Sequence, residues 1–363
     1  MSTRKASNTT NRRFSPWLSP TLVLGVALLV CSTAAPAQAQ TACPKEINSS
    51  ASCGCLAVSS VSLKADMLCM DKDGIIVGAN GITIRLNGFR IQCTDPLGYG
   101  MSCQGGTHPN NTGVKIVNRS NVTVRGSGAI QGFDTGILVS GGSYIEIEKL
   151  NITAPDADLG VFLAVGATPT ARPDTAGILV QGTSLYSDID IFANSVDNHT
   201  AGIRLENAKG VEVRMNFAHD NNGGLSSTFG GESHGVHLVD STDNVIHNNL
   251  VVDNGVNVGD DSGIMLDGSL NNRVHGNNVS FSNGDGISVR QGSANNVIDN
   301  NVILYNTSNE TIPSNGRIFF DLASKTGAGV NTFNTNNRCE TESTGVPATV
   351  CNSGEGEAWT KKP

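Results

Sequence analysis

A four-residue motif, Gly-(Ile/Val)-x-(Leu/Val/Ile), recurs seven times in this chain of 363 residues and constrains its fold more than any other feature. The copies are separated by 23, 41, 25, 33, 28 and 23 residues and begin at Gly113, Gly136, Gly177, Gly202, Gly235, Gly263 and Gly286. A short unit that repeats in this way buries its apolar side only by stacking on its neighbours. The motif therefore predicts a solenoid.

Each repeat also contains short runs in which apolar and polar residues alternate, such as Val122 and Val124 or Ile189 and Ile191. This period of two is typical of strands, and about three runs fit into one repeat. Asn and Gly between the runs suit left-handed turns, and Asn at matching turn positions can form side-chain ladders. We expect an all-β fold, a single-stranded right-handed parallel β-helix with disulfide-stabilised N- and C-terminal caps.

Two sequence features resemble known right-handed β-helix proteins of the pectate-lyase-like superfamily. Gly81–Ile91, GITIRLNGFRI, resembles the first coil of many such proteins, and turns such as Asn272–Val274 resemble bacterial repeats. Such repeats occur in carbohydrate-binding and sugar-hydrolase domains, and in a periplasmic protein used in assembling a copper reductase. The resemblance implies the fold strongly and the function weakly.

The ends of the chain carry different signals from its middle. Residues 1–39 have a basic leader, an apolar run and Ala37-Gln38-Ala39, the pattern of a cleaved export signal. We expect a Cys-rich N-terminal cap at 40–72, the β-helix at 73–338, and a C-terminal cap and tail at 339–363. The predicted localisation is therefore exported, either periplasmic or secreted.

Charge excludes some partners. Cleavage after Ala39 would remove four basic residues and no acidic ones, leaving 20 Lys and Arg against 32 Asp and Glu, a net charge of −12. A nucleic-acid-binding protein needs a basic surface, so we expect no nucleic acid partner. No later segment is apolar enough to span a membrane, and we expect a monomer.

The cysteines concentrate at the two ends of the expected solenoid. Eight follow the predicted cleavage site, namely Cys43, Cys53, Cys55, Cys69, Cys93, Cys103, Cys339 and Cys351. An even number in an exported protein indicates disulfides. The pairing of the first six stays open, and Cys339 with Cys351 is the expected C-terminal bridge.

Three insertions interrupt the regular coil, each before a Gly-Ile strand. The first lies between Gly136 and Gly177 and includes Pro155–Asp158 and Val165–Pro173; the others fall at Asn221–Ser233 and Gly255–Asp261. In one register they project from the same side and wall a groove beside that sheet. Loops inserted on one face of a solenoid often form binding sites.

Acidic residues and a histidine stand at the start of successive coils beside this expected groove. Stacked coils lie about 4.8 Å apart, so Asp261 and Asp285 would lie on neighbouring coils, with Asp260 and His234 close by. Paired carboxylates of this kind cleave glycosidic bonds, and stacking raises one pKa, as a general acid needs. We predict Asp261, Asp285, Asp260 and His234 as catalytic residues; the alternative is that these are ordinary turn residues.

Gly259-Asp260-Asp261 resembles the paired acids of polygalacturonases. The sequence departs from that family where His234 and Asp285 stand in place of an Asp and a His, and where Arg317-Ile318-Phe319 lacks a Lys. The resemblance therefore implies an acidic site but not the specific activity.

The outward positions of the Gly-Ile strands align in two columns. The first contains Arg204, His237, Met265 and Ser288, and the second contains Glu206, Asp267 and Arg290. We predict His237, Arg204, Glu206, Asp267 and Arg290 as substrate-binding residues. An Arg beside a carboxylate also suits a lyase that removes a proton next to a uronate group; the alternative is a solvated sheet face with charge pairs.

Metal sites have weaker support. Ca²⁺ is the one cofactor that the sequence suggests, because it prefers oxygen ligands such as those of Asp253, Asp260 and Asp261. Alignment of their turns sets His247 and His275 one position out of step, so they are not expected to share a metal, and no metal ligand is assigned. His219 and Asp220 form a further outlying pair.

The function predicted from these patterns is an exported polysaccharide-active β-helix protein that cleaves glycan as a hydrolase or a uronate lyase. Its partner would be a polysaccharide or oligosaccharide. The alternatives are a non-catalytic glycan-binding or surface module and a periplasmic accessory protein for a metalloenzyme.

Overall fold

The computed structural model describes residues 40–70, 72–94, 111–154, 175–184, 187–222, 233–255, 261–306, 320–325, 327–340 and 345–351. The chain divides into two units, Met1–Ala39 and Gln40–Pro363, and every described residue belongs to the second. The predicted export signal, Cys103, Asp260, the tail after Cys351 and most of the three insertions lie outside the described residues.

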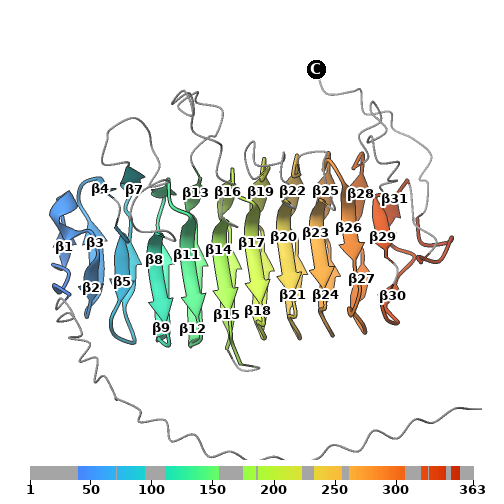
Figure 1. Cartoon of the computed structure of the whole chain (residues 1–363), viewed down its shortest axis with the longest axis horizontal. Helices are drawn as coiled ribbons and strands as arrows, with labels where there is room; N and C mark the ends of the chain where they lie inside the picture. The colour runs from blue at the N-terminus through green and yellow to red at the C-terminus, as the bar shows by residue number, and fades with distance from the viewer. Residues whose placement is uncertain are drawn as a thin grey trace, which may run out of the picture. The chain divides into compact units, whose positions relative to one another are not determined.

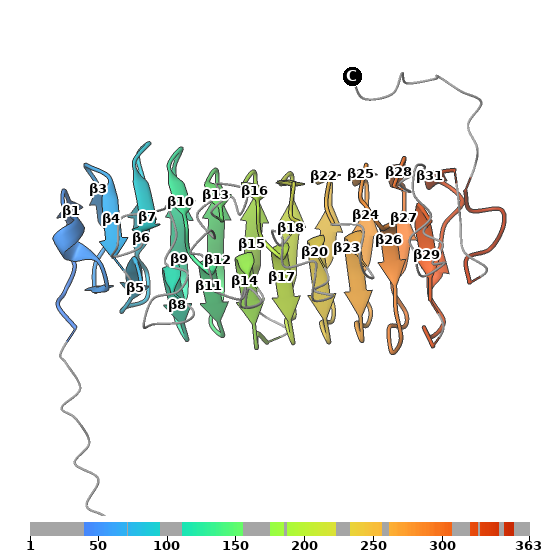
Figure 2. The same ribbon diagram turned by 45° about the horizontal axis from the view of Figure 1, so that its top comes forward.

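Three parallel sheets form the second unit (Figures 1 and 2). Sheet A carries the Gly-Ile motif and consists of β2 (Cys55–Ala57), β5 (Ile75–Val77), β8 (Thr112–Val117), β11 (Thr135–Ser140), β14 (Ala176–Gln181), β17 (Ala201–Glu206), β20 (His234–Val239), β23 (Ser262–Asp267), β26 (Asp285–Val289) and β29 (Leu322–Ser324). Sheet B consists of β1 (Glu46–Ile47), β3 (Val61–Leu63), β6 (Thr83–Arg85), β9 (Ser120–Arg125), β12 (Ser143–Glu148), β15 (Ile189–Phe192), β18 (Val211–Arg214), β21 (Val245–His247), β24 (Arg273–His275), β27 (Val297–Asp299) and β30 (Thr332–Phe333). Sheet C consists of β4 (Met67–Met70), β7 (Arg90–Thr94), β10 (Ala129–Gln131), β13 (Asn151–Thr153), β16 (Ser195–Asp197), β19 (Phe217–His219), β22 (Leu250–Val252), β25 (Asn278–Ser280), β28 (Val302–Leu304) and β31 (Arg338–Cys339).

From β2 onward, successive strands belong to sheets A, B and C in turn. Each strand therefore pairs with the strand of the same sheet in the next coil, and Figure 1 shows these strands side by side in chain order. The only helix in the described ranges is the short 3₁₀ turn η1 (Ser50–Ser52). The predicted all-β right-handed parallel β-helix is confirmed.

The motif side chains stack in columns inside the coils. The aliphatic residue after each motif glycine is fully buried in the core, as at Ile203, Val236 and Ile264, and these three are paired in register. Burying such a side chain contributes about 1.5–3 kcal/mol. Because every coil supplies one residue to each column, a shift of register would move this entire set away from the core.

Close packing explains why the motif begins with glycine. A Cβ atom on Gly235 would stand 2.5 Å from Val251 Cγ1 and 2.8 Å from the carbonyl oxygen of Gly263. The position therefore faces the core, as the next residue Val236 also does. Two consecutive inward positions break the alternation of β20, and this brings His234 and His237 to the same outer side.

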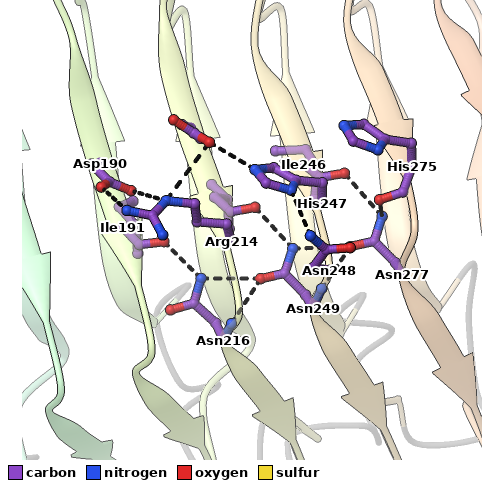
Figure 3. Close-up of polar contacts among 12 residues, drawn as sticks. Asp190, Ile191, Arg214, Asn216, Ile246, His247, Asn248, Asn249, His275 and Asn277 are labelled. Carbon is purple, nitrogen blue, oxygen red and sulfur yellow. Dashed lines mark hydrogen bonds and ion pairs between the residues drawn. The ribbon is translucent and has the colours of Figure 1, made fainter.

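Buried asparagines form ladders at the turns between sheets. Asn249 shows the pattern: its Nδ2 donates to the carbonyl oxygen of Val213 and to Asn277 Oδ1, both at 2.9 Å, and its Oδ1 accepts from the backbone N–H and the Nδ2 of Asn216. Figure 3 shows Asn216, Asn249 and Asn277 in line across neighbouring coils. The predicted ladders are confirmed, and they satisfy backbone groups that would otherwise be buried without partners.

Disulfides lie at both ends of the coil stack. Cys43 pairs with Cys55, Cys53 with Cys69, and Cys339 with Cys351, as predicted for the last pair. Cys93 is also disulfide-bonded. Among the described residues, no helix has the length and apolar character needed to cross a membrane.

Replacing one ladder asparagine tests how strongly the ladder stabilises the fold. Asn249→Ala leaves the buried N–H of Asn216 and the carbonyl of Val213 without partners, and each such group costs about 1–3 kcal/mol. We therefore expect the free energy of unfolding, measured by urea titration, to fall by about 2–5 kcal/mol. Asn278→Ala, at an exposed position of β25, is the matched control and should change it by less than about 0.5 kcal/mol.

Candidate functional site

The outer face of sheet A presents the two columns that the sequence predicts. Arg204, His237, Met265 and Ser288 pair in register on β17, β20, β23 and β26. Glu206 and Asp267 lie in the second column, separated by Val239. The backbone N–H of Arg290 donates to Leu266, which continues the same parallel ladder.

Two imidazoles and a thioether gather in the middle of this face. The ring centroids of His234 and His237 are 4.4 Å apart, with the planes tilted by 59°. Met265 is paired with His237 across β20 and β23 and is fully buried, yet it does not belong to the apolar core of the coil. We call His234, His237 and Met265 the sheet A cluster.

Burial controls the charge of this cluster. His237 is 9 % exposed and His234 is 1 % exposed. Desolvation places the pKa of His237 well below its ordinary value of 6.5. The nearby His234, Arg204 and Arg290 lower it further, because positive neighbours disfavour a second positive charge. His237 is therefore neutral near pH 7, and a neutral imidazole is the form that binds metals.

His237 also has an unused acceptor or donor atom. Its Nε2 is buried and makes no hydrogen bond to any residue in the described ranges. A buried polar atom without a partner costs free energy that the fold must offset. Such atoms are uncommon in folded proteins and suggest a role in binding or catalysis.

Asp285 lies on the same face and forms a buried ion pair. Lys325 Nζ stands 2.6 Å from Asp285 Oδ2, and the backbone N–H of Phe320 donates to Oδ1 at 3.0 Å. Burial raises the pKa of Asp285 above its ordinary value of 3.8, and the charge and hydrogen bond of Lys325 oppose that rise. The sequence did not single out Lys325, which comes 40 residues after its partner.

Asp261 is fully buried and has a structural contact. Its Oδ1 accepts a hydrogen bond of 2.7 Å from the backbone N–H of Ser233 on the preceding coil. In register, Asp285 lies opposite Ser262 rather than Asp261, so the two acids lie on neighbouring coils with an offset of one residue. Their predicted catalytic roles stay predictions.

Two of the predicted substrate-binding residues, Arg204 and Glu206, form an ion pair with each other. Arg204 Nε and Glu206 Oε2 lie 3.7 Å apart, with side chains 22 % and 38 % exposed. Surface pairs of this kind contribute about 0–1 kcal/mol, so they do not by themselves fix the fold. Both side chains remain accessible to a ligand on this face.

The prediction that His247 and His275 lie one position out of step is wrong. The sequence alignment set them out of step, but β21 and β24 pair them directly, and their rings stack at 4.9 Å between centroids with planes 6° apart. Both lie twelve residues after a motif glycine, Gly235 and Gly263, so counting from the motif would have placed them correctly. Aligning Asn244 with Arg273, rather than with Asn272, caused the error.

These two histidines have polar neighbours on the outer face of sheet B (Figure 3). His247 Nε2 contacts Glu212 Oε1 at 2.7 Å, and Asn248 Nδ2 donates to its Nδ1 at 3.0 Å. Both ring nitrogens of His247 are thus engaged. Within the described ranges, no group of three or more His, Cys, Asp or Glu side chains is arranged to hold a metal ion. The proposed Ca²⁺ set includes Asp260, which lies outside those ranges.

The lowered pKa of His237 predicts a pH-dependent stability. Neutral His237 contributes to the free energy of unfolding, and this contribution is fully present above pH 6.5. It is lost as the pH falls from 6.5 toward the lowered pKa of the folded protein, because only the unfolded chain binds the proton in that range. In metal-free buffer, each unit by which the pH falls within this range should lower the free energy of unfolding by at most about 1.4 kcal/mol through His237.

Urea titrations at several pH values would measure that slope. The His237→Gln variant should lose this part of it, whereas His247→Gln, which removes a histidine on another sheet, should retain it. An unchanged slope in His237→Gln would contradict the assignment.

The family model described as "Periplasmic copper-binding protein (NosD)" matches residues 164–345, which is just over half of the chain and includes the whole sheet A cluster. No curated protein gives a significant match.

Several solved structures are similar in fold. The periplasmic alginate epimerase AlgG is 15 % identical, with 79 % of this chain and 69 % of that chain covered and a TM-score of 0.42. The A-module of the Azotobacter vinelandii mannuronan C-5 epimerase AlgE4 is 13 % identical, with 80 % and 84 % covered and a TM-score of 0.36. The Dettilon tailspike protein is 16 % identical, with 77 % and 56 % covered and a TM-score of 0.39. The activities in these names belong to those proteins.

The family match covers the coils that contain His234, His237 and Met265, and it spans half of the sequence. The chain therefore belongs to the family described as periplasmic copper-binding protein (NosD).

Proposed function

We propose that the protein is an exported, periplasmic accessory protein of a copper enzyme, and that it holds Cu(I) at the sheet A cluster. The observation that carries this proposal is the buried Nε2 of His237, which has no partner among the described residues and lies in a cluster with a second imidazole and a thioether. The family name supplies the metal, and these side chains supply suitable ligands.

The ligand types favour cuprous ion over harder cations. Thioether and imidazole groups select Cu(I), whereas Ca²⁺ and Mg²⁺ prefer carboxylate and carbonyl oxygens. Met265 is fully buried, lies outside the apolar core cluster and is paired in register with His237.

The charges around the cluster point the same way. Arg204 and Arg290 lie close enough to lower the pKa of His237. Their positive charge opposes a divalent ion more strongly than a monovalent one, because the repulsion scales with the charge of the ion. Burial, supported by His234 and the same arginines, lowers the pKa of His237 and keeps it unprotonated, so a cuprous ion need not displace a proton from it.

Removing the ligands should weaken copper binding. Cu(I) affinity of the mature protein would be measured anaerobically by competition with a chromophoric chelator. We expect His237→Ala and Met265→Leu each to weaken it by at least about tenfold. X-ray absorption of the copper-loaded protein should show a sulfur scatterer that Met265→Leu removes.

Two matched variants control this experiment. Met215→Leu changes an exposed methionine, and His275→Ala changes a histidine of the stacked pair on sheet B, so both should bind copper as the wild type does. Wild-type affinity in a folded His237→Ala, Met265→Leu double variant would overturn the proposal.

A second candidate function is glycan binding or cleavage on the same face, favoured by the raised pKa and burial of Asp285. A carboxyl group whose pKa is raised is protonated over a wider pH range, and the protonated form can donate a proton to a leaving oxygen. In this proposal Asp285, Asp261, Asp260 and His234 carry the chemistry. The substrate is positioned by His237, Arg204, Glu206, Asp267 and Arg290.

Asp285→Asn separates this function from copper binding. Polygalacturonate, alginate and neutral glycans would be assayed for reducing ends and for the ultraviolet absorbance of an unsaturated product. If the glycan proposal is right, the wild type turns over one of them and Asp285→Asn loses at least about 100-fold in rate while its Cu(I) affinity is unchanged. Absence of turnover by the wild type on every glycan would eliminate cleavage.

A further inference from the structure

A hydrogen-bonded chain of a serine, a histidine and an aspartate lies on the outer face of sheet C. Ser195 Oγ is 3.2 Å from His219 Nε2, and His219 Nδ1 is 2.9 Å from Asp220 Oδ2. Ser195 begins β16 and His219 ends β19, which are neighbouring strands of the sheet (Figure 1). The sequence pointed to His219 and Asp220 as a pair but gave no indication of the serine.

The two contacts of the ring determine its tautomer. An ionised Asp220 only accepts hydrogen bonds, so His219 Nδ1 carries the proton and donates it. Nε2 is then an acceptor, and the hydroxyl of Ser195 donates to it. This is the arrangement in which an imidazole withdraws a proton from an attacking hydroxyl.

The surrounding structure holds the imidazole in place. The ring of Phe217 stacks on that of His219, with centroids 4.0 Å apart and planes at 23°. Asp220 has a φ of 51°, a left-handed turn conformation that folds its carboxylate back toward the preceding residue. The His219 side chain is 21 % exposed, so a substrate can approach it.

The neighbours of Ser195 supply the other parts of a reactive site. Phe217 is directly opposite Ser195 and Leu250 is opposite Phe217, and both are exposed at 38 % and 40 %, which gives an apolar edge beside the hydroxyl. On the other side, Asn151 is paired with Ser195. Its Oδ1 accepts from Thr153, while its Nδ2 makes no hydrogen bond to a described residue and is available as a donor.

We propose that Ser195 is a nucleophile, that His219 is its general base oriented by Asp220, and that this site hydrolyses carboxylic esters with a small acyl group, the class that includes O-acetyl esters. The apolar edge accommodates the acyl methyl group. Asn151 Nδ2 donates to the oxygen that becomes negative during attack. The open sheet surface leaves space for a large alcohol.

The reaction balances without a cofactor. Ser195 Oγ forms a bond to the acyl carbon as its proton passes to His219 Nε2; the ester C–O bond breaks, and the alcohol leaves with that proton. Water then attacks the acyl group and gives a proton to His219, and release of the carboxylic acid returns the proton to Ser195. The site lies on sheet C and shares no residue with the sheet A cluster, so it does not depend on either function proposed above.

A serine-directed probe tests the proposal most directly. The mature protein would be treated with a fluorophosphonate, and the labelled peptide would be identified by mass spectrometry. Hydrolysis of 4-nitrophenyl acetate would be followed in parallel. We expect labelling at Ser195 and measurable hydrolysis, with Ser195→Ala and His219→Gln each reducing the hydrolysis rate by at least about 100-fold.

The matched control is Ser280→Ala, which removes a partly buried serine from the same face of sheet C and should retain labelling and rate. Asp220→Asn should lower the rate while leaving Ser195 in place, because the imidazole loses the acceptor that fixes its tautomer. Absence of labelling in the folded wild-type protein, labelling at another residue, or full activity in folded Ser195→Ala would each overturn the proposal.

Discussion

The in-register stacking of coils through buried asparagines is the interaction on which the rest of this structure depends. Each ladder amide bonds to the backbone of one coil and to the asparagine of the next, as Asn249 does with Val213 and Asn277. Because the amide is buried, a shift of register would leave several polar groups without partners. The ladder therefore fixes which residues of neighbouring coils face one another.

Fixed register turns residues that are distant in sequence into neighbours on a surface. His237 and Met265 meet on sheet A because their strands pair without offset. Ser195 on sheet C is in register with Phe217 and reaches His219 diagonally on the same neighbouring strand. The coil supplies three such surfaces, and each can carry its own chemistry. A solenoid built in this way can host separate sites without a change in its core.

Two polar groups on the sheet A face are buried in different ways. Asp285 is paired with Lys325, so its charge is compensated inside the protein. His237 instead stays neutral, surrounded by positive groups and with one ring nitrogen lacking a partner among the described residues. The first arrangement stabilises the structure as it stands, whereas the second leaves a buried ring nitrogen that a bound ligand would satisfy under the function proposed above.

The sequence by itself determined the β-helix, its asparagine ladders, the bridge between Cys339 and Cys351, and the column of Arg204, His237, Met265 and Ser288. The column follows from a fixed number of residues after each motif glycine, and the bridge follows because these two cysteines alone come after the last repeat. It also contained the pairing of His247 with His275, which misalignment of one turn concealed. Only the tertiary structure decided the contacts that depend on side-chain direction or on a returning segment: His234 beside His237, Lys325 on Asp285, and Ser195 on His219. The first depends on the break of alternation at Gly235, the second on a partner 40 residues later in the chain, and the third on a diagonal contact between neighbouring strands. The periodicity of the sequence encodes none of these.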